Sequence, residues 1–154
     1  MSNNINPDQW ATPSLWRRLA AIVYDSALVA AVLLMAMALV VVPIDLFFGS
    51  ESFDAATLRS NPFYLAYLFC VMVGFHILFW TRGGQTLGMR AWRLKVLRND
   101  GQPLKFKDAL LRYCAAILSW ALFGLGFIWI LLDKDGLAWH DRISNTRLVI
   151  LEKK

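Results

Sequence analysis

Three long apolar blocks separate the polar segments of the chain and determine the predicted architecture. They cover residues 19–44, 62–80 and 113–132. The first contains one charged residue, Asp25, the second contains only the ionisable His76, and the third contains neither kind. A helix needs roughly 20 apolar residues to cross a hydrocarbon core about 30 Å thick, so each block is long enough. The pattern predicts an all-α membrane protein with two transmembrane helices and a third hydrophobic block.

The third block could cross the membrane as a single span or fold back as a broken re-entrant hairpin. Residues 124–126, Gly-Leu-Gly, stand near its middle, where glycines can break or hinge a helix. The helix can begin before the block, because apolar residues recur at helical spacing from Phe106 to Tyr113. We favour the folded-back form, which returns the tail to the side of the preceding loop.

The first block shares two features with a cleaved signal peptide. Arg17 and Arg18 precede it, and residues 36–38, Ala-Met-Ala, resemble a cleavage site. The apolar run continues to Val42 and is longer than the apolar region of a signal peptide. We therefore interpret the first block as a retained span.

Lysine and arginine are distributed unevenly between the polar segments. The head, residues 1–18, carries Arg17 and Arg18, and residues 43–61 carry one basic residue among three acidic ones. The positive-inside rule therefore predicts a multi-pass protein of the inner (cell) membrane, with a cytoplasmic N-terminus and an outer 43–61 segment. The loop of residues 81–112 is strongly basic and is predicted to be cytoplasmic; its basic residues are Arg82, Arg90, Arg93, Lys95, Arg98, Lys105, Lys107 and Arg112.

A small cytoplasmic β element is predicted from the loop and the tail, residues 133–154. Two short alternating runs flank the turn signal Asn99-Asp100-Gly101, which is typical of a hairpin. The tail sequence TRLVILEK predicts another strand, and a third strand would stabilise an otherwise marginal pair. Strands from the loop and the tail can pair only if both segments lie in one compartment.

The ionisable residues near the inner ends of the blocks are the candidates for chemistry. Asp25 follows Arg18 by seven residues, about two helical turns, so the two share a helix face but are too far apart along it to pair. His76 and Arg112 are expected at a similar depth, and we expect the partners of Asp25 among them. An ionisable residue within the membrane can couple ion or proton movement, or it can be a polar link between helices.

Other chemistries are weakly supported by the polar segments. The glycines after Thr81 lack the P-loop pattern, and the basic loop is better explained by anionic lipid headgroups than by nucleic acid. Gly83, Gly84 and Gly88 are interpreted as sites of tight turns or close packing. The His140-Asp141 pair is a poor metal-ligand set, and Cys70 and Cys114 lie inside apolar blocks. We expect no enzyme activity, metal or cofactor.

Three stretches in order resemble the RDD family of small membrane proteins. They are RRLAAIVYD, with Arg18, Ala21 and Asp25 in an R-x-x-A-x-x-x-D pattern; GQTLGMRAWRLKV, followed by Asp100-Gly101 and LLR; and LAWHDRISNTRLV. The resemblance covers about residues 15–150, so residues 19–150 are expected to form one RDD-like domain. One departure is that Met89 and then Arg90 follow the second motif's glycine, where family members often have a lysine.

The resemblance assigns roles to particular residues. The family's arginine falls on Arg18, its first aspartate on Asp25 and its second on Asp141. The other residues that the resemblance assigns to the family's motifs are Gly84, Thr86, Gly88 and His140. The resemblance implies transport, with cation–proton antiport described for some relatives, and two or three spans per chain would then require a homo-oligomer. The alternative is a non-transporting accessory or scaffold protein that binds another membrane complex.

Overall fold

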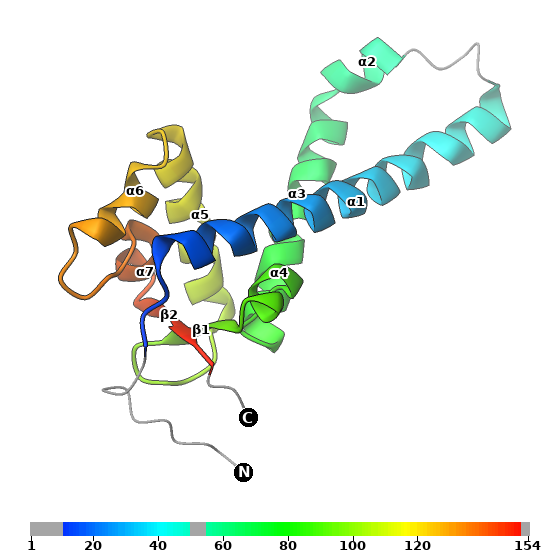
Figure 1. Ribbon diagram of the computed structural model, residues 1–154. Helices are drawn as coiled ribbons and strands as arrows, with labels where there is room; N and C mark the ends of the chain where they lie inside the picture. The colour runs from blue at the N-terminus through cyan, green and yellow to red at the C-terminus, as the bar shows by residue number, and fades with distance from the viewer. Residues whose placement is uncertain (1–10, 50–54, 152–154) are drawn as a thin grey trace. The chain divides into compact units, whose positions relative to one another are not determined.

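The protein is mostly helical, with one small sheet, and has the predicted all-α membrane class (Figure 1). The computed structural model describes residues 11–49 and 55–151. Most of the predicted head, the acidic Glu51 and Asp54, and the last three residues lie outside them. The elements are α1 (Leu15–Phe48), α2 (Ala55–Ser60), α3 (Pro62–Arg82), α4 (Leu87–Ala91), β1 (Leu94–Arg98), α5 (Phe106–Ala121), α6 (Leu125–Ile128), the 3-10 helix η3 (Trp129–Leu131), α7 (Trp139–Ile143) and β2 (Thr146–Ile150).

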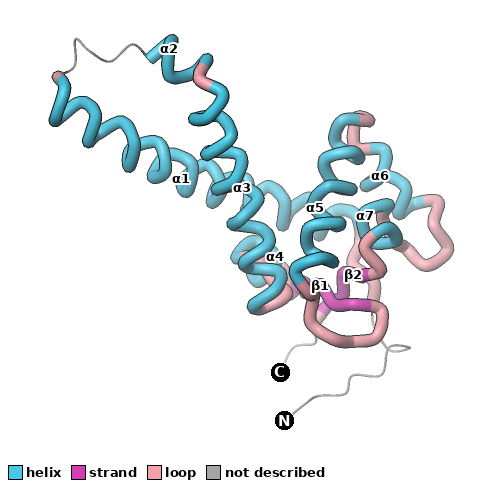
Figure 2. Tube along the Cα trace, turned by 180° about the vertical axis from the view of Figure 1, so that it is seen from behind, coloured by secondary structure: helices cyan, strands magenta, loops and turns pink. Residues whose placement is uncertain are grey.

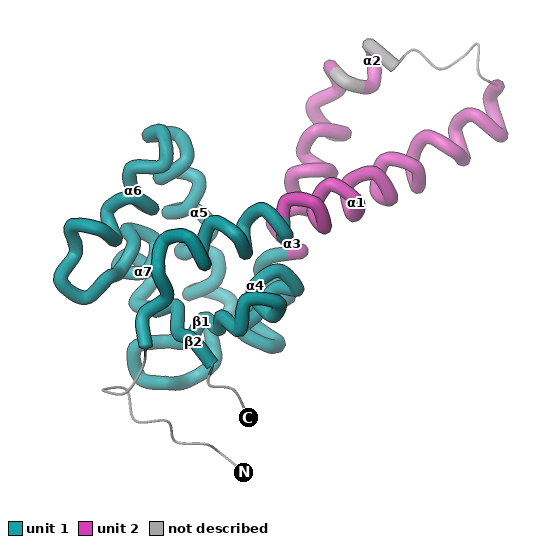
Figure 3. Tube along the Cα trace, viewed as in Figure 1, with its two compact units in different colours: residues 1–25, 76–154 teal, residues 26–75 magenta. Residues whose placement is uncertain are grey.

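The chain divides into two compact units (Figure 3). Unit 1 comprises residues 1–25 and 76–154, and unit 2 comprises residues 26–75. All the candidate functional residues belong to unit 1, so their mutual geometry is defined within one body.

The first two apolar blocks form the long helices α1 and α3. With 34 and 21 residues, these helices are about 51 and 31 Å long, enough to cross a bilayer. Few residues in their apolar windows are buried inside the chain, as expected for surfaces that face lipid or another protein. At the start of α3 the Asn61 side chain accepts hydrogen bonds from the amides of Phe63 and Tyr64, which caps the helix.

Unit 1 is organised around an antiparallel sheet made from the loop and the tail. Strand β1 pairs with β2, with Leu94 opposite Ile150 and Arg98 opposite Thr146 (Figure 2). Leu94 and Val96 are almost completely buried beneath it. The pairing confirms the predicted loop–tail sheet and the inference that the two segments share a compartment.

The third block folds back, because its two flanks meet in this sheet. Helix α5 starts at Phe106, as expected, and ends at Ala121. The chain then turns by 107° into α6 and η3. A single straight span is therefore wrong, and Gly124, with a left-handed φ of 76°, lies at the turn.

The predicted local hairpin around Asn99-Asp100-Gly101 is only half correct. The turn forms, with the Gly101 amide 2.8 Å from the Arg98 carbonyl and the Arg98 amide 3.0 Å from the Gln102 carbonyl. Residues 102–105 do not continue as a strand. Pro103 has no amide hydrogen to donate to a ladder, and β1 pairs with the tail instead.

Candidate functional site

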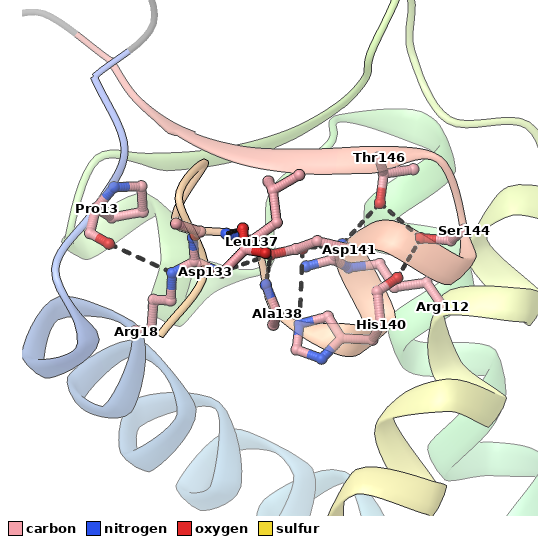
Figure 4. Close-up of polar contacts among 11 residues, drawn as sticks. Pro13, Arg18, Arg112, Asp133, Leu137, Ala138, His140, Asp141, Ser144 and Thr146 are labelled. Carbon is pink, nitrogen blue, oxygen red and sulfur yellow. Dashed lines mark hydrogen bonds and ion pairs between the residues drawn. The ribbon is translucent and has the colours of Figure 1, made fainter. Parts of the chain in front are cut away.

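The first of two buried polar groups in unit 1 surrounds Asp141, at the start of α7. We call it the Asp141 cluster, comprising Arg18, Arg112, His140, Asp141, Ser144 and Thr146 (Figure 4). Asp141 is the third residue of α7, and its carboxylate accepts a hydrogen bond of 3.0 Å from the Ala138 amide at the helix start. A carboxylate at this position both satisfies an otherwise unpaired amide and interacts favourably with the helix dipole.

Two arginines from distant parts of the chain clamp the Asp141 carboxylate. Arg18, in the first turn of α1, places Nη1 2.7 Å from Oδ2. Arg112, on α5, places Nη1 2.6 Å from Oδ1. The remaining nitrogens of Arg18 donate to the backbone carbonyls of Pro13 and Gly136. One buried aspartate thus joins α1, α5 and α7.

The Asp141 cluster carries more positive than negative charge, because two guanidinium groups face one carboxylate. Part of the excess is met by an aromatic face: the guanidinium carbon of Arg112 lies 5.5 Å from the centre of the Trp80 ring. The Nη1 of Arg112 also donates to the Thr146 hydroxyl at 2.7 Å. Its Nε is buried without a hydrogen-bond partner among the described residues.

Ser144 and Thr146 complete the cluster from the turn between α7 and β2. Their hydroxyl oxygens lie 2.7 Å apart, and the Ser144 hydroxyl donates to the His140 carbonyl. Both side chains are buried. The hydroxyl chain connects the arginine on α5 to the end of α7, so the polar groups of the tail support one another.

Burial and charge act in opposite directions on the pKa of Asp141. Burial alone would raise this pKa, but the positive charge of Arg112, interactions with His140 and Arg18, and the Ala138 amide lower it well below its usual range. Asp141 is therefore an anion held by its neighbours.

His140 has a pKa that is lowered from 6.5 to about 3. Burial is the largest cause, and the positive charge of Arg112 acts in the same direction, against the attraction of Asp141. The ring packs 4.8 Å from Phe127, and its Nδ1 is buried without a hydrogen-bond partner among the described residues. A neutral His140 leaves the net positive charge of the Asp141 cluster unchanged.

The second polar group joins Asp25, in α1, to the start of α4. We call it the Asp25 clip, comprising Asp25, Thr86 and Gly88. The Thr86 hydroxyl donates to Oδ2 at 2.5 Å, and the Gly88 amide donates to Oδ1 at 2.9 Å. Thr86 also caps α4 by accepting a hydrogen bond from the Met89 amide. Both carboxylate oxygens of Asp25 are therefore engaged by the loop that follows α3.

Close packing explains why the Asp25 clip requires a glycine. A Cβ added at Gly88 would lie 2.5 Å from the Ala21 carbonyl oxygen and 2.8 Å from the Asp25 carboxyl carbon. At Gly84 the constraint comes from β1, since an added Cβ would lie 2.7 Å from the Val96 carbonyl oxygen, and φ is +68°. The interpretation as close-packing and turn positions is confirmed for Gly84 and Gly88, whereas a Cβ added at Gly83 would meet no atom closer than 3.7 Å.

The expected partnership of Arg112 with Asp25 was wrong. Arg112 was expected near Asp25 but binds Asp141. The His76 ring lies 5.5 Å from that of Trp80 and 5.4 Å from that of Tyr113, while Asp25 is held by loop groups. The position of a residue along its helix gives its depth in the membrane. It does not tell which residues of other helices or loops lie beside it, so it could not identify the partners of Asp25.

The sequence reasoning missed Ser144 and the backbone acceptors of Arg18. Ser144 lies in the run Ile-Ser-Asn-Thr, which is typical of a turn and gives no sign of burial. The carbonyls of Pro13 and Gly136 have no side-chain signature at all. Thr146 was placed in a strand and in the third motif, but its contact with Arg112 depends on the fold-back of the third block.

The arrangement of the two polar groups follows the order of the three sequence motifs. Arg18 of the first motif binds Asp141 of the third, and Asp25 of the first binds Thr86 and Gly88 of the second. The model of the RDD family matches residues 12–145, which include all of these positions. The chain belongs to the RDD family.

A curated relative agrees with this RDD assignment. The chain is 32% identical over 125 residues to the Uncharacterized protein YxaI of Bacillus subtilis (strain 168), a match that covers 69% of this chain and 82% of that protein. No solved structure matches the chain. The protein is thus an RDD membrane protein in which Arg18, Asp25 and Asp141 are engaged inside one unit.

Proposed function

We propose that this RDD protein is a non-transporting accessory protein of the inner membrane, with a cytoplasmic N-terminus and no enzyme activity. Its two spans would anchor unit 1 at the membrane, and its exposed surfaces would bind another membrane protein. The observation that supports this proposal is that both oxygens of Asp25 and of Asp141 accept hydrogen bonds from groups of the same chain.

A carboxylate that couples ion movement has to exchange its partners during each cycle. A cation arriving at Asp25 would have to displace the Thr86 hydroxyl and the Gly88 amide, and hydrogen bonds to a charged group contribute about 1.5–3 kcal/mol each. At Asp141 it would have to separate a buried carboxylate from two arginines, and breaking one buried pair costs about 3–5 kcal/mol. These contacts favour permanent structural links over exchangeable ligands.

The exposed surface offers two kinds of contact for a partner. The outward faces of α1 and α3 are apolar, with few residues buried inside the chain. The loop and tail add basic side chains, which suit anionic headgroups or an acidic protein surface. A membrane protein with an acidic surface next to its spans is the partner class that meets both requirements.

Co-purification from native membranes in mild detergent tests the accessory function. We expect a stoichiometric foreign membrane protein that is retained by the wild type and lost when exposed loop charges such as Arg90 and Arg93 are changed to Ser. Substitution of Asn for Asp45, an exposed charged residue outside both the loop and the tail, is the matched control. Recovery of a pure homo-oligomer would count against the proposal.

Cation–proton antiport by a homo-oligomer is the second candidate. It is favoured by the position of Asp25, an ionisable residue within a helix long enough to span the membrane. Its Thr86 partner is a hydroxyl, which can donate to a carboxylate or accept from a carboxylic acid, so the contact can survive protonation. Arg18, His76 and Arg112 would be the other coupling residues.

Proteoliposome flux separates the two functions. The accessory function predicts no cation-driven proton flux above that of empty liposomes. Antiport predicts wild-type flux that Asp25→Asn abolishes while the protein keeps its detergent stability. Wild-type flux of that kind would replace the first proposal by the second.

A further inference from the structure

The hairpin made by α5, α6 and η3 presents an outer surface that is free of charged side chains beyond Arg112 and mostly apolar. Residues 113–132 contain no charged side chain. Large apolar side chains stand exposed on both arms and at the turn, among them Leu118, Trp120, Leu122, Phe123, Leu131 and Leu132. An apolar surface of this extent marks a contact with lipid or protein.

The turn between the two arms satisfies its own backbone amides. The amides of residues 122–125 donate in order to the carbonyls of Leu118, Trp120, Ser119 and Leu122, at 2.8–3.1 Å. The amides of Phe127 and Ile128 in α6 both donate to the Gly124 carbonyl. Water would satisfy these groups at an aqueous tip, whereas each unpaired backbone group in hydrocarbon costs several kcal/mol, so the internal pairing of these amides lowers the cost of placing the turn in the membrane.

Phe123 adopts a strained conformation at the tip. Its φ is +54°, in the left-handed region that bulky residues rarely occupy, and its side chain is 94% exposed. Glycine or asparagine would fit this backbone with less strain. Residues held in such conformations cluster at sites where the side chain has a use, and an exposed phenyl ring has one in an apolar surrounding.

The hairpin has the dimensions of one leaflet. From Tyr113 to Ala121 the charge-free part of α5 rises about 13 Å, close to half of a hydrocarbon core of about 30 Å. Helix α5 follows β1 along the chain, and η3 leads through a loop and α7 to β2, the partner of β1 (Figure 2). The exposed lysines Lys105, Lys107 and Lys134 flank the bases of the arms, where anionic headgroups would lie.

We propose that the α5–α6–η3 hairpin is a re-entrant element whose apolar surface is covered by the acyl chains of one leaflet. It enters from the side of the β1–β2 sheet and leaves by the same side, with Phe123 deepest. This inference concerns lipid contact and does not depend on whether the protein is an accessory protein or a transporter.

Nitroxide labels on the full chain in bilayers of phosphatidylethanolamine and phosphatidylglycerol test the proposal. The exposed Cys70 and Cys114 are first changed to Ala. Single cysteines then replace Phe123 at the tip, Leu131 on the returning arm and, as the matched control, Lys107 at the base. Collisions with oxygen, which is concentrated in hydrocarbon, are compared with collisions with a water-soluble nickel complex.

We expect the ratio of oxygen to nickel collisions to be several-fold higher at positions 123 and 131 than at 107, and highest at 123. High nickel access at 123 would place the tip in water and overturn the proposal. Low access to both reagents at 123 and 131 would mean that protein, such as a second copy, covers the hairpin, and would also overturn it. The separate positions at the tip and on the returning arm keep the test decisive if one cysteine variant does not fold.

Discussion

Replacing Gly88 by Ala should break the Asp25 clip, and the structure gives the size of the effect. The added methyl would lie 2.5 Å from the Ala21 carbonyl oxygen, so α4 has to move away from α1. That movement lengthens the hydrogen bonds from Thr86 and Gly88 to Asp25. Because each such bond to a carboxylate contributes about 1.5–3 kcal/mol and part of each survives a small shift, we expect a loss of about 3 kcal/mol.

Gly83→Ala is the matched control for this substitution. A Cβ at Gly83 would meet no atom closer than 3.7 Å, and it lies in the same loop. The free energy of unfolding is measured by denaturant titration in detergent micelles, and hydrogen exchange of the α4 amides reports the local effect. We expect faster exchange of the Met89 amide in Gly88→Ala and nearly wild-type exchange in Gly83→Ala.

A double-mutant cycle identifies the clip as the cause. Asp25→Ala removes the acceptor, so adding Gly88→Ala to it should cost far less than Gly88→Ala in the wild type. Equal effects of Gly88→Ala and Gly83→Ala, or full additivity of Asp25→Ala and Gly88→Ala, would refute the assignment of Asp25 to a structural link.

Three other outcomes follow from the buried polar groups. Asp141→Asn should lower the free energy of unfolding by about 3–5 kcal/mol, since it leaves two buried guanidinium groups without their carboxylate, whereas Arg18→Met should lower it by less, since Asp141 keeps Arg112; unchanged denaturant midpoints for Asp141→Asn would contradict this. Because the pKa of His140 is lowered to about 3, the unfolded chain binds a proton that the folded chain excludes, so stability should fall as pH drops from about 6.5 to 4.5. His140→Phe should flatten that slope in thermal melts, and a slope identical to the wild type would show that another group causes it. Ser119→Ala should leave stability unchanged or raise it in the same titration, because the Ser119 hydroxyl is buried without a hydrogen-bond partner among the described residues.

The elements that depend on local pattern could be predicted from the sequence. The apolar blocks 19–44 and 62–80 became α1 and α3, whose bounds exceed them by up to four residues at an end. Alternation in the tail predicted β2, and helical spacing predicted the start of α5 at Phe106. In each case the order of apolar and polar side chains within one segment is enough to predict the element, so no distant contact has to be known.

The partners of the ionisable residues could not be predicted in the same way. Asp25 binds a hydroxyl and a backbone amide, and a backbone amide has no sequence signature. Asp141 meets Arg18 and Arg112 only after the third block folds back, which the sequence left open between two forms. The motif resemblance singled out Arg18, Asp25 and Asp141, which are all buried and hydrogen-bonded, but it did not say which residue each would contact.

The long sequence separation between Arg18 and Asp141 has a consequence for the order in which the chain is made and folds. The two residues are 123 positions apart, so the ribosome adds Asp141 long after α1 has entered the membrane. Until then Arg18 is an uncompensated positive charge beside the first span, the kind of charge that holds an N-terminus on the cytoplasmic side during insertion. Once the tail is made, the same guanidinium is withdrawn into the Asp141 cluster. One arginine can thus first direct the topology of the chain and then close its last tertiary contact.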